Sequence, residues 1–192
     1  MKPRVAILIS GRGSNMEALI KAARAPDFPA EIALVLSNRT DAAGLEMARS
    51  LGVEAVAIPT LPFGKDREGH ERAIDAELVR RGIRLVCLAG YMRLLTPWLV
   101  RRWEGRMLNI HPSLLPKFPG LETHARVLAA GETEHGCTVH LVTDGMDEGP
   151  VLGQARVPVL PDDTESTLAA RVLVQEHRLY PEILARIAQK ES

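Results

Sequence analysis

Short runs of apolar residues alternate with longer stretches of helical period through the first half of the chain, and this alternation limits the possible folds most strongly. Four short, predominantly apolar runs predict strands: Val5–Ile9, Ile32–Leu36, Val53–Ile58 and Leu85–Ala89. Helices are predicted between them, over residues 16–25, 44–51 and 67–81. Strands that are apolar throughout and separated by helices are typical of a parallel sheet covered on both faces. The pattern therefore predicts a doubly wound α/β fold.

In the second half of the chain, the predicted strands are separated by loops and not by regular helices. A strand over Met107–Ile110 leads into a proline-rich loop, residues 111–120. Two further runs, Cys137–Val142 and Val151–Val159, are predicted as strands, and a polar loop over residues 143–149 separates them. Because these two runs are close in sequence, we expect them to pair as antiparallel neighbours. The expected sheet is thus mostly parallel but mixed.

A final helix is predicted from near Asp162 to about Ala188. The spacing of Asp162 and Glu165 fits a capping box, and Pro181 is expected to kink or interrupt the helix. Neither an internal repeat nor a linker-like segment is present in the sequence. We therefore expect one domain over residues 1–192.

The charge balance argues against partners with a large uniform charge. Lys plus Arg equals Asp plus Glu, at 24 each, whereas proteins that bind nucleic acids or membrane surfaces usually carry a basic excess. No apolar run approaches the roughly 20 residues of a membrane helix, and the N-terminal run is too short for a signal peptide. Small-molecule substrates, without nucleic acid or membrane, and a cytoplasmic location are expected. The sequence leaves a homodimer open.

The cysteines and histidines do not suggest a metal site. Cys87 and Cys137 lie far apart within apolar runs and are interpreted as buried small hydrophobic residues without a disulfide. The histidine spacings match no common zinc pattern. No metal is expected.

The segment Ser10–Asn15 lies where the first predicted strand passes into the first helix. Glycines at such a turn allow close approach of a ligand, and free N–H groups at a helix start attract phosphate. The third glycine of the dinucleotide fingerprint and the lysine of a P-loop are both missing. The segment therefore favours a monophosphate over a dinucleotide, and a tight strand-to-helix turn without a ligand remains the alternative.

Asn109 and His111 are two residues apart at the end of a predicted strand, so they face the same side. An asparagine amide can donate a hydrogen bond to a carbonyl oxygen that gains negative charge, and a histidine can supply a proton. A structural hydrogen-bonding role for His111 is the alternative. The acidic loop over residues 143–150 matters for this chemistry only if one of its carboxylates reaches His111.

Five ordered segments together closely resemble the glycinamide ribonucleotide formyltransferase family, the folate-dependent enzymes of purine synthesis. The similarity extends from Val5 to about Pro181. The segments are Ile9–Asn15, Leu88–Leu95, Leu108–Gly120, His135–His140 with the loop that follows it, and Gln175–His177 with Tyr180–Pro181. The resemblance implies a Rossmann-like formyltransferase fold, with phosphate binding in the N-terminal half and folate binding and catalysis in the C-terminal half. It also implies 10-formyltetrahydrofolate as co-substrate and the amine of glycinamide ribonucleotide as acceptor.

The resemblance further implies roles for individual residues. Asn109, His111 and Asp147 match the family's catalytic trio: Asn109 hydrogen-bonds the oxyanion, His111 acts as imidazolium and proton donor, and Asp147 favours the charged ring. The ribonucleotide contacts correspond to Gly13, Ser14, Asn15 and Glu176. The folate contacts correspond to Arg67, Met92, Arg93, Leu94, Leu95, Asn109, Thr143, Asp144, Gly145, Met146 and Asp147.

Three other functions are weighed against this one. Methionyl-tRNA formyltransferases share the core around Asn109 but add an RNA-binding domain, and formyltetrahydrofolate hydrolases add an N-terminal regulatory domain. Neither addition is expected in this neutral chain, whose glycine-rich turn begins at Ser10. A non-catalytic nucleotide-binding module would explain that turn, but it gives no reason for Asn109, His111 and Asp147 to occur together.

Overall fold

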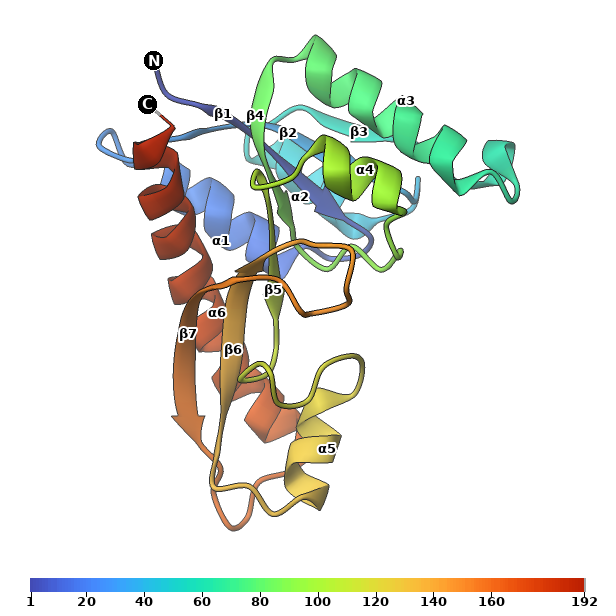
Figure 1. Cartoon of the computed structure of the whole chain (residues 1–192). Helices are drawn as coiled ribbons and strands as arrows, with labels where there is room; N and C mark the ends of the chain where they lie inside the picture. The colour runs from blue at the N-terminus through green and yellow to red at the C-terminus, as the bar shows by residue number, and fades with distance from the viewer. Residues whose placement is uncertain (192) are drawn as a thin grey trace.

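A single seven-stranded sheet runs through the computed structural model, which describes residues 1–191 (Figure 1). The strands are β1 (Arg4–Ile9), β2 (Glu31–Ser37), β3 (Ala55–Ala57), β4 (Ile83–Leu88), β5 (Met107–His111), β6 (Glu134–Leu141) and β7 (Val151–Pro158). The helices are α1 (Ser14–Ala23), α2 (Ala43–Ser50), the 3₁₀ turn η1 (Leu61–Phe63), α3 (Arg67–Arg80), α4 (Pro97–Arg102), α5 (Thr123–Ala129) and α6 (Glu165–Lys190). The predicted α/β class and single-domain architecture are confirmed.

The order of strands across the sheet is β3-β2-β1-β4-β5-β6-β7. Strands β1 to β5 pair in parallel, whereas β5 with β6 and β6 with β7 pair antiparallel, as the sequence predicts. The chain moves outward from β1 to β3 and then returns to the other side of β1 at β4. In doubly wound sheets, ligands bind at the carboxyl ends of strands beside such a reversal. The segments after β1 and β4 are therefore the expected walls of a site.

The sheet is buried on both faces, which explains the unbroken apolar runs. On β1, Val5, Ile7 and Ile9 belong to one hydrophobic cluster, together with residues of α1, α2 and α6. Ala6 and Leu8 point to the other cluster, together with residues of α3 and α4. Each β1 side chain from Val5 to Ile9 is fully buried. A strand with alternating apolar and polar residues would place polar side chains against one of the two helical layers.

Helix α6 connects the two halves of the molecule (Figure 1). It packs on α1, β6 and β7, and the Tyr180 hydroxyl lies 2.9 Å from the carbonyl oxygen of Leu88 on β4 and 3.2 Å from that of Leu108 on β5. The helix continues through the buried Pro181, so the predicted interruption is wrong. Packing on both sides of Pro181 compensates for the backbone hydrogen bond that proline cannot make.

The start of α6 and the length of some other elements also differ from the prediction. The N-cap is Thr164, whose side chain accepts from the Thr167 N–H, and not Asp162 with Glu165. Asp163 accepts from the Leu160 N–H and pairs with Arg171, which orders the residues before the helix. The edge strand β3 is shorter than predicted. The sequence analysis missed two short elements, η1 and α5.

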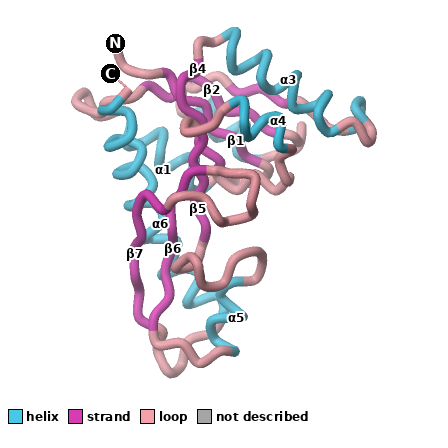
Figure 2. The backbone as a smooth tube through the Cα atoms, viewed as in Figure 1, coloured by secondary structure: helices cyan, strands magenta, loops and turns pink. Residues whose placement is uncertain are grey.

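The long loops after β5 and β6 lie on the same side of β5, as Figure 2 shows in pink. They meet directly, because the Gly120 N–H donates to Asp147 Oδ2 at 2.8 Å. Cys87 and Cys137 are buried and free, as predicted. No helix within residues 1–191 is long and apolar enough to cross a membrane.

Candidate active site

The turn between β1 and α1 presents free backbone N–H groups. Gly13 caps α1 in the left-handed conformation, with φ of 71°, and no side chain caps the helix. The N–H groups of the first helical turn therefore have no intrahelical partner. Gly44 of α2 supports this turn: its N–H donates to the Gly11 carbonyl, and a Cβ there would lie 2.4 Å from Ile9 Cδ1. The sequence analysis did not identify Gly44, since only the packing of α2 reveals the close approach.

Glu176 of α6 reaches the same turn. Asn15 Nδ2 donates to Glu176 Oε1 at 3.1 Å across 161 residues of sequence, and both side chains are buried. Burial raises the pKa of Glu176, and the hydrogen bond from Asn15 opposes this effect. Asn15 Oδ1 and His177 Nε2 have no hydrogen-bond partner in the described chain. The structure thus brings the predicted ribonucleotide residues Gly13, Ser14, Asn15 and Glu176 together, with buried polar atoms left unpaired beside them.

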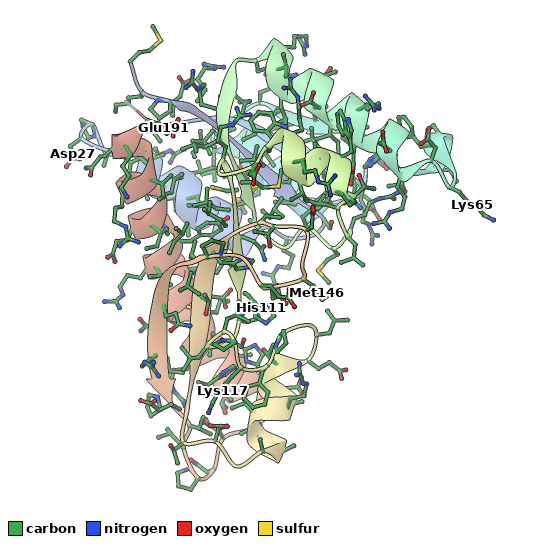
Figure 3. All side chains as sticks on the ribbon, viewed as in Figure 1. Asp27, Lys65, His111, Lys117, Met146 and Glu191 are labelled. Carbon is green, nitrogen blue, oxygen red and sulfur yellow. The ribbon has the colours of Figure 1, made fainter. Side chains whose placement is uncertain are left out.

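His111, at the end of β5, lies in the middle of the molecule beside the loop that carries Met146 (Figure 3). Its ring has an acceptor on each side: Nε2 lies 2.9 Å from the Phe118 carbonyl oxygen, and Nδ1 lies 3.5 Å from Asp147 Oδ2. A neutral imidazole has only one N–H and can satisfy only one of these acceptors. The imidazolium carries an N–H on each nitrogen and can satisfy both.

Both partners of His111 come from strained backbone. Phe118 has φ of 53° and Asp147 has φ of 55°, and they are two of the three non-glycine residues with positive φ among residues 1–191. Such conformations cost energy and persist only where the surrounding structure holds them. The Asp147 carboxylate is held by the Gly120 N–H, and its side chain is 11% exposed. The loops are therefore shaped around His111.

His140 of β6 is a fourth member of this cluster, and the sequence analysis missed it. In the antiparallel register His140 lies opposite Asn109, and its Nε2 is 3.2 Å from Asn109 Nδ2. The same nitrogen lies 3.9 Å from Asp147 Oδ1. Burial lowers the pKa of His140; the hydrogen bond to the Leu141 carbonyl and the charge of Asp147 oppose this, and His111 adds to it. Only the register of β5 with β6 could have identified this residue.

The segments predicted to hold folate are more exposed than the cluster. Met92, Leu94 and Met146 are 72%, 62% and 55% exposed, whereas Arg93 and Leu95 are half-buried. Thr143 and Asp144 are exposed, Gly145 is half-buried, and Asp144 pairs with Arg101 of α4 at 3.1 Å. Large apolar side chains gathered at an open surface are typical of an interaction or ligand-binding site.

Two contacts connect the segment after β4 to the rest of the site. Arg67, the first residue of α3, donates from its guanidinium to the Leu94 carbonyl. The Met92 N–H donates to Ser10 Oγ at 2.9 Å, and the Ser10 hydroxyl donates to Asn38 Oδ1. Ser10 therefore joins the turn after β1 to the segment predicted to bind folate. Within residues 1–191, no group of three or more His, Cys, Asp or Glu side chains could hold a metal ion.

Comparison with known proteins extends the similarity across the whole fold. Residues 3–184 match the formyl transferase family. Among solved structures, the phosphoribosylglycinamide formyltransferase of Brucella melitensis superposes with a TM-score of 0.94 at 56% identity, over 98% of this chain and 96% of that one. Glycinamide ribonucleotide transformylase 1 of Symbiobacterium toebii gives a TM-score of 0.95 at 45% identity, over 98% of this chain and 89% of that one.

Curated relatives include both short and long proteins. The chain is 45% identical to phosphoribosylglycinamide formyltransferase of Escherichia coli over 96% of its length and 86% of the relative's. It is 48% identical to the trifunctional purine biosynthetic protein adenosine-3 of Drosophila pseudoobscura pseudoobscura over 97% of its own length, but it spans only 14% of that protein. With the family match over residues 3–184 and this similarity along nearly the whole chain, the protein belongs to the formyl transferase family.

Proposed function

We propose that this chain transfers the formyl group of 10-formyltetrahydrofolate to the amine of glycinamide ribonucleotide, giving formylglycinamide ribonucleotide and tetrahydrofolate. The observation that carries the proposal is the position of His111 between Asp147 Oδ2 and the Phe118 carbonyl, with Asn109 two residues earlier on the same strand. Such an arrangement supports the proposal because it has an amide donor and an imidazole on the same face of one strand. The names of the Escherichia coli and Brucella melitensis relatives support the same reaction.

In the proposed reaction the neutral amine attacks the formyl carbon, and the carbonyl oxygen becomes an oxyanion in a tetrahedral intermediate. The Asn109 amide donates to this oxygen, and the His111 imidazolium adds positive charge beside it. One well-placed donor of this kind contributes about 3 kcal/mol to transition-state stabilisation. The remainder must come largely from holding the amine and the formyl carbon in contact.

Collapse of the intermediate breaks the bond from the formyl carbon to the folate nitrogen. That nitrogen takes up a proton while the attacking amine loses one, so the net reaction exchanges a formyl group for a proton. His111 is the donor in reach, and Asp147 holds its ring in the charged form. Acid–base assistance of this kind contributes roughly 10²- to 10⁴-fold in rate.

The proposed substrate contacts follow from the two sides of the site. The ribonucleotide phosphate would bind the free N–H groups at the start of α1, with Gly13, Ser14 and Asn15, and Glu176 would contact the ribose and amine side. Support comes from the uncapped N–H groups of this turn, which suit the phosphate, and from the unpaired Asn15 Oδ1, an acceptor that suits a hydroxyl or the amine of the ribonucleotide. The pterin ring would bind between residues 92–95 and 143–147, and Arg67 would approach the glutamate tail. The equal numbers of acidic and basic residues support a small acceptor over a tRNA.

The proposal is tested by following formyl-folate turnover in the purified protein, with glycinamide ribonucleotide present and then omitted. We expect turnover that requires the ribonucleotide and that falls by at least about 10²-fold in His111→Ala. Turnover without an acceptor would identify a hydrolase. Turnover only with charged initiator tRNA would identify a different formyl acceptor, and either result would overturn the proposal.

A further inference from the structure

One hydrogen bond and the burial of His140 together define the state of its ring. Nδ1 lies 2.9 Å from the Leu141 carbonyl oxygen, and a carbonyl can only accept, so Nδ1 carries a proton and donates. The ring is 3% exposed, and burial disfavours a second proton. The neutral ring therefore has a lone pair on Nε2.

That lone pair faces the Asn109 side chain at 3.2 Å. An amide NH₂ can donate to it, whereas the amide oxygen in the same place would meet another lone pair. The orientation of the Asn109 carboxamide is thus set by His140: Nδ2 faces Nε2. The second N–H of Asn109 has no partner within residues 1–191, so it remains available for a substrate oxygen.

We propose that His140 is a positioning residue, which holds the Asn109 carboxamide with its N–H donor toward the formyl oxygen. This inference rests on the proposed function, because the formyl oxygen is the acceptor that Asn109 would meet. The charged and titratable groups that face His140 are Asp147 in the loop after β6 and His111 on β5. His111 touches the reacting atoms in this scheme, whereas His140 acts only through Asn109.

Proton placement separates the two histidines of the cluster. Two acceptors surround the His111 ring, and an imidazolium satisfies both. The His140 ring has one acceptor and one donor at hydrogen-bond distance, with Asp147 Oδ1 farther away at 3.9 Å, and in its buried place this arrangement favours a neutral ring. If His140 were charged, its new Nε2–H would face the Asn109 NH₂. The carboxamide would then rotate by half a turn and present its oxygen to the oxyanion, which would repel it. The neutral state of His140 is therefore required for Asn109 to act as a donor.

The first test compares His140→Leu with His140→Gln. Leucine removes the acceptor, and we expect kcat to fall roughly 10- to 100-fold with KM for both substrates within about threefold. Glutamine can present its amide oxygen near the position of Nε2, and we expect it to restore kcat to within about fivefold of the wild type. His135→Leu is the matched control, because His135 lies on the same strand and is buried to the same degree but contacts His124. If that control lowers kcat as much as His140→Leu does, the inference is wrong.

A double-mutant cycle tests whether His140 acts through Asn109. Asn109→Ala removes the amide, so in that background His140→Leu should change kcat by less than about threefold. An equal fold-loss in both backgrounds would show that His140 acts independently and would overturn the inference. The cycle separates positioning from a general loss of stability, since an unstable strand would harm both backgrounds.

The proton positions can be measured without activity. In the ¹⁵N NMR spectrum of the wild type at neutral pH, we expect His140 to carry its proton on Nδ1 and none on Nε2. We also expect His140→Leu to shift the side-chain amide resonances of Asn109. A proton on Nε2, or unchanged Asn109 resonances, would overturn the inference even in an active enzyme. If the wild type transfers no formyl group but the spectra agree, the proposed reaction has failed and the orientation of Asn109 stands.

Discussion

His111 and Met92 belong to the same proposed site, but His111 is 6% exposed and Met92 is 72% exposed. In the cluster of Asn109, His111, His140 and Asp147, the two histidines are buried and the other two residues are half-buried, and each member contacts at least one other member. The segments over residues 92–95 and 143–146 leave large apolar side chains in solvent. In the proposed site this difference would separate chemistry from binding: fixed side chains would act on the reacting atoms, and an open surface would receive a large substrate.

His111→Ala should have the largest effect, because it removes the charged ring and the proton donor together. We expect kcat to fall about 10³-fold or more, with ribonucleotide binding within about threefold of the wild type. Steady-state kinetics and calorimetric titration with the ribonucleotide measure the two quantities. A loss that appears only in KM would show that His111 contributes to substrate binding and not to the chemical step.

Asp147→Asn should rank second. The amide oxygen can still accept from the Gly120 N–H, so the loop should keep its structure, but the negative charge beside His111 is lost. We expect kcat to fall about 10²-fold. Glu148→Gln is the matched control, since it removes a neighbouring exposed carboxylate of the same loop and should leave kcat within about twofold. Equal losses in the two variants would mean that the loop's total charge matters, and not its contact with His111.

Met92→Ala should change binding only. We expect KM for the formyl-folate to rise about three- to tenfold, because a large apolar surface is removed from the exposed wall, while kcat stays within about twofold. Val79→Ala, at the other end of α3 from Arg67, removes another exposed apolar side chain and should change neither quantity. A drop in kcat for Met92→Ala would break the separation of chemistry from binding.

His135→Gln should have the smallest effect on turnover and a visible effect on stability in acid. Burial lowers the pKa of His135 to about 4, with the neighbouring His124 and His111 adding to the shift. The unfolded chain therefore binds a proton more readily, and the free energy of unfolding should fall as the pH drops from about 6.5 to about 4. The variant should lose roughly 2–3 kcal/mol of that pH dependence, measured by urea unfolding at pH 7 and pH 4. A pH dependence identical to that of the wild type would contradict the assignment.

The regular elements around β1 could be predicted because their signals are local. Unbroken apolar runs indicate strands buried on both faces, and the glycines at 11 and 13 indicate a tight turn before α1. The common face of Asn109 and His111 follows from the two-residue period of a strand. Short elements such as α5 were missed because seven residues carry too weak a periodic signal.

The contacts that complete the site depend on the tertiary structure. Asn15 meets Glu176 across 161 residues only because α6 packs on α1, and His140 meets Asn109 only in the observed register of β5 with β6. A shift of one residue in that register would turn His140 to the opposite face.

The sequence by itself therefore determined the α/β class, the strands and helices of the parallel half, and the residue types available for catalysis, because each depends on neighbours within a few positions. Only the tertiary structure decided which acceptors surround each histidine. The Phe118 carbonyl and Asp147 reach His111 from two loops, and the Leu141 carbonyl leaves the second nitrogen of His140 free to accept from Asn109. Proton placement depends on these distances of a few ångströms, which arise from packing between segments far apart in the chain.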